Sequence, residues 1–253
     1  MEFSGKRVFL TGGSGGLGRP TAAKLVNAGA DVTVLSRNWT NDGIAAIRHV
    51  GVDLATKEGI ATATSLVERE MPDILINMAG TQFFGPIEKQ SLEAMHAGYM
   101  INLIAPAALC CASVTFMKQR NSGQIAIVGS ILGSIPFAHF TAYSSAKGGL
   151  RAFSEALRRE LAGTNIAVTY VAPRAMRTGM LTSEMQKYAE LTGMKVDAPE
   201  RVATRVLSAI QQRKKEVYIG FPEQLFVRLN AVLPRVVDAA VATGDRKAAA
   251  LFI

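Results

Sequence analysis

The chain has 253 residues, of which 49% are hydrophobic and 19% charged, and its formal net charge is +8. This length suits one large α/β domain, and the hydrophobic fraction is too high for a disordered chain. The basic residues are scattered and lack the spacing of a zinc finger, an RRM or a homeodomain. We therefore expect a solvated basic surface, with no nucleic-acid partner and no metal site.

The two cysteines, Cys110 and Cys111, are adjacent within an apolar stretch. A disulfide between neighbours would be strained and would close no useful loop, so we predict reduced thiols in the core. We also expect no targeting leader and no apolar run of about 18 residues that could span a membrane. These features predict a cytoplasmic protein.

Short β-branched runs alternate with longer helical stretches along the chain. Strands are predicted at Arg7–Thr11, Asp31–Leu35, Asp73–Asn77, Gln124–Gly129, Ile166–Val171 and Glu216–Gly220, with a weaker strand near His49–Val52. Most of them are apolar on both faces, as in parallel sheets covered by helices. The predicted fold is therefore a single-domain α/β structure, a doubly wound parallel sheet of the Rossmann type.

The two longest predicted helices span Ser91–Arg120 and Tyr143–Gly163. The least regular segment is Met180–Asp197, and a further helix opens at Pro199.

A glycine-rich run, Thr11-Gly12-Gly13-Ser14-Gly15-Gly16-Leu17-Gly18, follows the first predicted strand and precedes a helix. Glycines permit a tight turn there and let backbone N–H groups approach a pyrophosphate at the helix N-terminus. A turn without a ligand would also use glycine. The position between a strand and a helix favours a dinucleotide site.

The second predicted strand runs into Ser36 and Arg37. A protein that prefers NAD carries a carboxylate at this point for the ribose 2′-hydroxyl, whereas a hydroxyl and a guanidinium suit a 2′-phosphate. The pattern favours NADP(H), and the alternative is that Arg37 is only a solvated side chain.

The glycine-rich run resembles the Thr-Gly-x-x-x-Gly-x-Gly element of the short-chain dehydrogenase/reductase family. Downstream, Asp53-Leu54 is similar to its adenine-contacting position, Asn77-Met78-Ala79-Gly80 resembles Asn-Asn-Ala-Gly, and Asn102, Ser130, Tyr143 and Lys147 resemble its catalytic tetrad. Ser130 lies 13 residues before Tyr143, and Lys147 lies four after it. The resemblance covers roughly residues 6–220 and implies an NADP(H)-dependent oxidoreductase acting on CH–OH and C=O groups.

The resemblance also implies a role for each residue of the tetrad. Tyr143 would exchange a proton with the carbonyl oxygen, Ser130 would hydrogen-bond that oxygen, and Lys147 would hold the nicotinamide ribose. Asn102 would position a relay water. Because residues four apart share a helical face, we expect the Lys147 cation to lower the pKa of the Tyr143 phenol. Each residue alone has an ordinary structural alternative, such as a cap or a solvated side chain.

The cofactor contacts implied by the resemblance are Thr11, Gly12, Ser14, Gly16, Leu17, Gly18, Ser36, Arg37, Asp53, Leu54, Asn77, Ala79, Gly80, Tyr143, Lys147, Pro173 and Thr178. Two positions depart from the family pattern. Met78 replaces an asparagine, and Arg174 follows Pro173 where the family usually has glycine. Arg174 is expected either to face the surface or to contact a cofactor phosphate or a substrate anion.

After Thr178, the apolar residues Leu181, Met185, Tyr188 and Leu191 recur at nearly helical spacing. Such a stripe often belongs to a core, but this position predicts an adaptable pocket wall, to which Phe137 and His139 would add. We expect a small hydrophobic ketone or secondary alcohol as substrate, with an acyl, polycyclic or steroid-like skeleton.

We expect residues 1–220 to form the catalytic and cofactor-binding domain, with a substrate lid near 180–197, and residues 221–253 to form an amphipathic extension. The stripe of this extension holds Leu225, Leu229, Val232, Val236 and Ala239, has Arg228 and Arg235 nearby, and is kinked or interrupted at Pro234. It would be covered by the domain core, by a partner in a homo-oligomer (dimer or tetramer), or by an anionic membrane surface in peripheral contact. Core or subunit packing is favoured.

Other functions stay open at this point. One is a catalytically silent nucleotide-binding or membrane-associated scaffold on the same fold, and another is an epimerase or dehydratase. Hydride transfer to a ketone would exclude the scaffold, whereas turnover without net NADPH consumption would indicate the epimerase or dehydratase.

Overall fold

The computed structural model describes residues 2–40 and 47–252. Its centre is a seven-stranded parallel sheet in the order β3-β2-β1-β4-β5-β6-β7. The strands are β1 (Arg7–Thr11), β2 (Asp31–Ser36), β3 (Ile47–Gly51), β4 (Ile74–Asn77), β5 (Gly123–Val128), β6 (Ile166–Pro173) and β7 (Glu216–Ile219). Each predicted strand is present, with ends that differ by at most two residues. The predicted doubly wound fold is confirmed.

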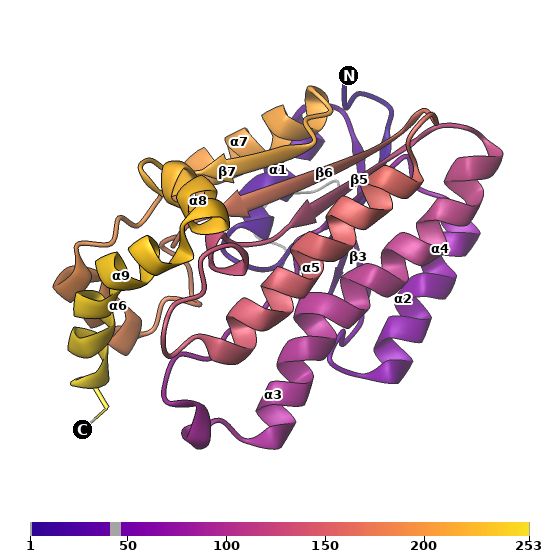
Figure 1. The fold of residues 1–253 in the computed structure, drawn as a ribbon. Helices are drawn as coiled ribbons and strands as arrows, with labels where there is room; N and C mark the ends of the chain where they lie inside the picture. The colour runs from indigo at the N-terminus through magenta and orange to yellow at the C-terminus, as the bar shows by residue number, and fades with distance from the viewer. Residues whose placement is uncertain (1, 41–46, 253) are drawn as a thin grey trace.

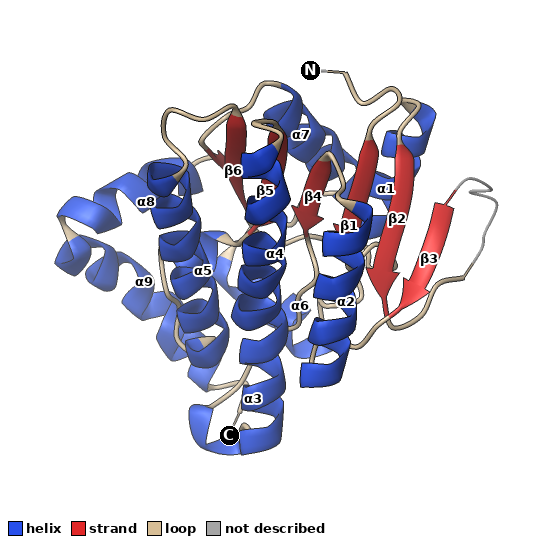
Figure 2. Ribbon diagram, turned by 90° about the vertical axis from the view of Figure 1, so that its right-hand side faces the viewer, coloured by secondary structure: helices blue, strands red, loops and turns tan. Residues whose placement is uncertain are grey.

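Helices cover both faces of the sheet (Figure 1, Figure 2). One face packs against α1 (Gly18–Asn27) and α7 (Pro199–Gln211), and the other against α2 (Lys57–Glu70), α4 (Ala105–Gln119) and α5 (Thr141–Glu160). Within β1, Val8 and Leu10 are buried on the face covered by α1 and α7, and Phe9 is buried on the opposite face. Both faces of a strand are buried, which explains the continuous apolar runs in the sequence.

The long helix predicted over Ser91–Arg120 is present at Leu92–Gln119, but it contains a π-helical turn. The structure has α3 (Leu92–Tyr99), then the π-helical turn η2 (Met100–Ile104), then α4. Asn102 lies in the π turn, and its side-chain Nδ2 donates to the carbonyl oxygens of Thr81 at 2.7 Å and Gly98 at 2.9 Å. π turns inside helices often occur at functional sites. Two 3₁₀ turns, η1 (Ile87–Lys89) and η3 (Ile131–Gly133), connect other elements.

The stretch Leu92–Gln119 is long and apolar enough to cross a membrane by length and composition, contrary to the expectation from the sequence. However, 56% of its most apolar window is buried inside the protein. Leu109, Phe116 and Met117 of this stretch belong to the core between α4 and the sheet. A core helix passes the same test of composition, so the stretch is weak evidence for a membrane span.

Both cysteines are unpaired, and they lie in different surroundings. Cys110 is buried and Cys111 is exposed, because adjacent residues of a helix point in different directions. The prediction of core thiols is correct for Cys110 and wrong for Cys111.

Three helices gather beyond the carboxyl ends of β6 and β7 (Figure 1): α6 (Ser183–Thr192), α8 (Glu223–Val232) and α9 (Pro234–Ala249). The segment that lacked a regular pattern therefore contains α6, which Thr182 caps by accepting a hydrogen bond from Met185 N at 3.3 Å. Pro234 stands at the first turn of α9, so the C-terminal extension is interrupted at the predicted residue.

The apolar stripe predicted for the extension is largely uncovered by the described chain. Leu225, Val232 and Val236 have exposed fractions of 51%, 76% and 52%, whereas Val227 and Val237 are buried. Packing of the stripe on the domain's own core is therefore wrong for those three residues.

The Thr169 hydroxyl in β6 allows the cost of an unpaired buried polar group in the core to be measured. It is fully buried, and no partner for it occurs among the described residues. Thr169→Val should raise the free energy of unfolding by about 1 kcal/mol, because a desolvated hydroxyl is replaced by a methyl group of similar shape. Urea denaturation measures the change.

Thr21→Val is the matched control, because the buried Thr21 hydroxyl donates to Leu17 O at 2.8 Å. This variant should lower the free energy of unfolding by about 1 kcal/mol. Equal destabilisation by both substitutions would contradict the assignment of Thr169.

Candidate active site

The carboxyl ends of the parallel strands meet at one edge of the sheet, where the strand order reverses between β1 and β4. A cavity of about 790 Å³ lies along this edge. Gly12 after β1, Ser36 at the end of β2, Ser130 after β5 and Pro173 at the end of β6 all line it. A single cavity therefore receives residues from strands that are far apart in the sequence.

The glycine loop is shaped by two close approaches. At Gly12, where φ is +68°, an added Cβ would lie 2.6 Å from Ala79 Cα, and at Gly18 it would lie 2.1 Å from Gly12 O. Neither position has room for a side chain. The first turn of α1 contains no acidic residue, and its N-cap Leu17 offers no side-chain hydrogen bond. The N-terminus of α1 therefore suits an anionic group such as a pyrophosphate.

Thr11 and Asn77 do not line the cavity. The Thr11 hydroxyl oxygen accepts hydrogen bonds from Met78 N at 3.0 Å and Ala79 N at 3.1 Å, which ties the ends of β1 and β4 together. Asn77 Nδ2 donates to Cys110 Sγ at 3.4 Å on α4. Both side chains therefore stabilise the backbone beside the cavity without lining it.

The residues after β2 and β3 form one end of the cavity, with Arg37 exposed at its rim. Ser36 Oγ donates to Asn38 O at 3.0 Å, and Asp53 Oδ1 accepts from Ala55 N at 2.9 Å. Within residues 2–40 and 47–252, no carboxylate forms an ion pair with Arg37. Asn38 and Leu54 also line this end, and the sequence analysis did not identify Asn38.

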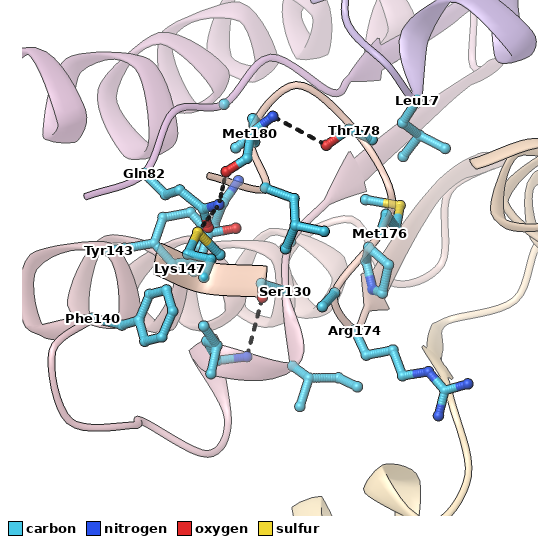
Figure 3. A pocket seen from close by; sticks show the side chains of 18 of the residues that line it. Leu17, Gln82, Ser130, Phe140, Tyr143, Lys147, Arg174, Met176, Thr178 and Met180 are labelled. Atoms are coloured by element: carbon cyan, nitrogen blue, oxygen red, sulfur yellow. Dashed lines mark hydrogen bonds between the residues drawn. The ribbon is translucent and has the colours of Figure 1, made fainter. Parts of the chain in front are cut away.

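Ser130, Tyr143 and Lys147 lie together on one wall of the cavity (Figure 3). Ser130 Oγ accepts a hydrogen bond from Leu132 N at 3.1 Å, which fixes the hydroxyl after β5. Lys147 is 3% exposed, and its Nζ lies 5.9 Å from the centre of the Tyr143 ring and donates to Val128 O at 3.3 Å. The spacing of four residues on α5 thus places the lysine beside the phenol, as predicted.

Burial dominates the electrostatics of this wall. Burial raises the pKa of Tyr143, and a hydrogen bond with Ser130 opposes that change in part. Burial also lowers the pKa of Lys147 from 10.5 to about 8. The expectation of a lowered Tyr143 pKa is therefore wrong for the protein chain by itself. The phenol holds its proton at neutral pH, which is the form that can donate it.

Asn102 does not line the cavity but lies close to its wall. A Cβ placed on Gly80 would lie 3.1 Å from Asn102 Oδ1 and 3.7 Å from Lys147 Nζ. Asn102 Oδ1 also accepts a hydrogen bond from Thr81 N at 3.3 Å. The amide thus fixes the loop after β4, and Gly80 lies between it and the lysine.

Of the two alternatives that the sequence left open for Arg174, a surface-facing side chain is wrong, whereas a contact with a bound anion stays a prediction, since Arg174 lines the cavity. Its guanidinium pairs with Asp197 at 2.9 and 2.8 Å and with both oxygens of Glu223 at 3.1 Å. The side chain is only 13% exposed, and it points away from Ser130 and Tyr143 (Figure 3). Arg174 therefore links the end of β6 to the segment before α7 and to the first turn of α8.

The segment that was predicted to form a substrate lid lines the cavity. Its lining side chains are Met180, Leu181, Met185, Tyr188, Leu191 and Met194. Thr178 packs against the glycine loop, since a Cβ on Gly16 would lie 2.6 Å from Thr178 Cβ. The chain just before this segment therefore packs against the glycine loop.

Two residues near the lid differ from the sequence analysis. Gln82, which it missed, donates from Nε2 to Met180 O at 2.8 Å and to Met185 Sδ at 3.2 Å (Figure 3). His139, predicted to line the pocket, instead packs against Phe84 and Phe252, with ring centres 6.2 and 4.8 Å apart. No signal in the sequence distinguishes Gln82, which contacts residues 180–185, from a polar residue of an ordinary loop.

Comparison with known proteins agrees with this arrangement. Residues 6–189 match the family described as short chain dehydrogenase, and the chain belongs to this short-chain dehydrogenase/reductase family of oxidoreductases. Dehydrogenase/reductase SDR family member 7B of Bos taurus is 30% identical, with 95% of this chain and 81% of the relative covered. Ketoacyl reductase HetN of Nostoc sp. is 31% identical, with 86% and 79% covered.

A solved structure is also similar. The short chain dehydrogenase from Burkholderia cenocepacia in complex with NADP superposes with a TM-score of 0.80 and 25% identity, covering 95% of this chain and 99% of that one. The similarity extends through the sheet and the helices on both faces, in agreement with the Rossmann-type fold.

The buried Lys147 predicts a pH dependence of stability. Its pKa is about 8 in the folded protein and 10.5 when solvated, so between these values the unfolded chain binds more protons. The free energy of unfolding should therefore rise with pH in this window, relative to Lys147→Met. The expected rise is about 1 to 3 kcal/mol, because one pKa unit corresponds to about 1.4 kcal/mol.

Denaturation of both proteins without added cofactor, between pH 7 and about pH 10, measures this difference. Below pH 8 the lysine is protonated in both states, so the difference should be constant there. A difference that is flat over the whole range would exclude a depressed pKa at Lys147.

Proposed function

We propose that this protein is an NADP(H)-dependent oxidoreductase that transfers a hydride between the nicotinamide and a hydrophobic ketone or secondary alcohol, with Tyr143 as the acid/base. One observation carries the proposal. Ser130, Tyr143 and Lys147 line the same cavity as the glycine loop at the N-terminus of α1. Dinucleotide binding and proton transfer can therefore take place in one cavity.

The nicotinamide supplies the hydride when the reaction runs toward reduction. In that direction Tyr143 Oη donates its proton to the carbonyl oxygen of the substrate. The Ser130 hydroxyl donates a hydrogen bond to the same oxygen and stabilises the negative charge that develops on it. The Lys147 ammonium, 5.9 Å from the phenol ring, favours the phenolate left on Tyr143 after the transfer.

The preference for NADP(H) is supported by the charges at the end of β2. Ser36 stands where a carboxylate would repel a 2′-phosphate, and the Arg37 guanidinium at the rim of the cavity can pair with one. The solved relative from Burkholderia cenocepacia is a complex with NADP.

The apolar lining supports a hydrophobic substrate. Phe137 and Phe140 face the lid residues Leu181 and Met185 across the cavity that holds Tyr143. Such walls bind by burial of apolar surface, and methionines adapt to varied shapes. The relative in Nostoc sp. is named a ketoacyl reductase, in line with an acyl-type substrate.

The proposal includes a homo-oligomer located in the cytoplasm. The homo-oligomer is supported by the exposed apolar side chains of Leu225, Val232 and Val236 on α8 and α9, because exposed apolar surface is often covered by a partner. Peripheral contact with an anionic membrane is the alternative. The mass in solution and sedimentation with liposomes distinguish the two.

The role of Tyr143 predicts that Tyr143→Phe lowers kcat for ketone reduction by about 10²- to 10⁴-fold, because general acid assistance is lost. The affinity for NADPH should stay within about threefold, since the ring remains in place. Tyr99→Phe is the control, because Tyr99 lies on α3 and bonds to Ser145 rather than lining the cavity. Reduction by Tyr143→Phe at the unmodified rate would remove Tyr143 from the mechanism.

The cofactor preference predicts that Ser36→Asp combined with Arg37→Ala reverses the choice of cofactor. The loss of a charge-assisted pair with the 2′-phosphate should weaken NADPH binding by about 10- to 100-fold, and the new carboxylate should strengthen NADH binding. Fluorescence titration with both cofactors measures the change. Arg48→Ala, which deletes an arginine paired with Glu70 outside the cavity, should leave both affinities unchanged. Equal affinities for the two cofactors in the unmodified protein would refute the preference.

A further inference from the structure

The cavity that holds Ser130 and Tyr143 continues beyond the lid to helix α9. Val237, Ala240, Val241 and Gly244 of this helix line it. Their spacing of three, four and seven residues places them on one helical face. Helix α9 therefore contributes a row of small or apolar residues to the cavity wall, beside Thr243 and Lys247.

Helix α9 is packed closely against the lid helix α6. A Cβ on Gly244 would lie 3.3 Å from Thr192 Cγ2, so the glycine lets the two helices approach. Lys247 Nζ donates to Leu191 O, an acceptor in the last turn of α6, at 3.3 Å. Ala248, one residue further on, is fully buried in a cluster with Met185 and Tyr188 of α6. These contacts hold α9 against α6.

Further contacts anchor the preceding helix and the end of the chain. Arg174 pairs with Glu223 in the first turn of α8, and Asn230 Nδ2 donates to Ser134 O at 2.8 Å. Beyond α9, Phe252 packs against Phe84, with ring centres 5.1 Å apart. The helices α8 and α9 are therefore tied to the catalytic domain at both ends, and α9 has a defined place relative to Tyr143.

The side chains opposite α9 are apolar as well. Ile135 and Phe137 approach it from the loop after β5, where they cluster with Val237 and Val241. Met185 and Leu191 line the cavity from the lid. A group that lies between these walls contacts the apolar side chains of both, and the small Ala240 occupies little of the space beside the helix.

We propose that α9 forms the distal wall of the substrate pocket and that Ala240 sets the length of the apolar group that the pocket accepts. The substrate class is then a carbonyl compound with an extended apolar group on one side of the reacting carbon. This inference rests on the proposed function for the reacting end of the site. The position of Ala240 on the cavity wall is independent of the chemistry.

Ala239 and Ala240 supply a matched pair of variants. Both are exposed alanines in the same turn of α9, but Ala240 lines the cavity and Ala239 does not. Ala240→Phe should fill the distal part of the pocket, and Ala240→Leu should fill less of it. Ala239→Phe adds the same ring on the other face of the helix. Melting temperatures of the variants establish that each is folded.

The probes are the straight-chain ketones 2-pentanone and 2-dodecanone. Their binding is measured by calorimetry with saturating NADP⁺, since a ketone cannot be reduced by the oxidised cofactor. In the unmodified protein each methylene that enters the pocket should strengthen binding by ~4-fold. Ala240→Phe should weaken 2-dodecanone binding at least tenfold and leave 2-pentanone within threefold. Ala240→Leu should be intermediate, and Ala239→Phe should resemble the unmodified protein.

Reduction of the same ketones with NADPH separates the two proposals. Ketones that bind with this pattern but are not reduced would refute the proposed reaction and leave α9 as the distal wall. Equal losses for both ketones in Ala240→Phe, no loss, or the same loss in Ala239→Phe would refute the role of α9. So would a failure of the unmodified protein to bind 2-dodecanone more tightly than 2-pentanone.

Discussion

The carboxyl ends of β1 and β4 approach each other so closely that a side chain at Gly12 would occupy the space of the Ala79 backbone. The Thr11 hydroxyl holds this approach by accepting hydrogen bonds from the two amides that follow Asn77. Because β1 and β4 are the strands between which the chain order reverses, this contact fixes the point at which the cavity opens. The N-terminus of α1 on one side and the end of β5 on the other take their positions from it.

Much of this arrangement could be predicted from local patterns. Apolar runs located the strands of the sheet, and helical spacing placed Lys147 beside Tyr143. The resemblance to the family added Ser130 to the same wall. The π turn at Met100–Ile104 could not be predicted in this way, because an apolar helix with one extra residue in a turn has nearly the same pattern as a regular one. Arg174 also escaped prediction, since its partners lie 23 and 49 residues away.

The stripe in the C-terminal extension shows a further limit of periodicity. Helical spacing identified a row through Leu225, Val232 and Val236, but the residues that are buried are Val227 and Val237. A helix with small or apolar residues on several faces offers more than one row. The choice between them depends on the neighbouring lid helix and on the loop after β5, and the periodicity of one segment carries no information about either.

The ion pairs of Arg174 limit the order in which this sequence could have been reached by single substitutions. A glycine at this position needs no partner, whereas an arginine with little solvent contact is costly until Asp197 or Glu223 neutralises it. Asp197 is as little exposed as Arg174, whereas Glu223 is 23% exposed, so Glu223 is the partner that is better tolerated before the arginine is present. Substitution of Arg174 by glycine would in turn leave Asp197 and Glu223 without this partner. The residue that follows β6 and the helix that begins at Glu223 are therefore expected to change together among descendants of this sequence.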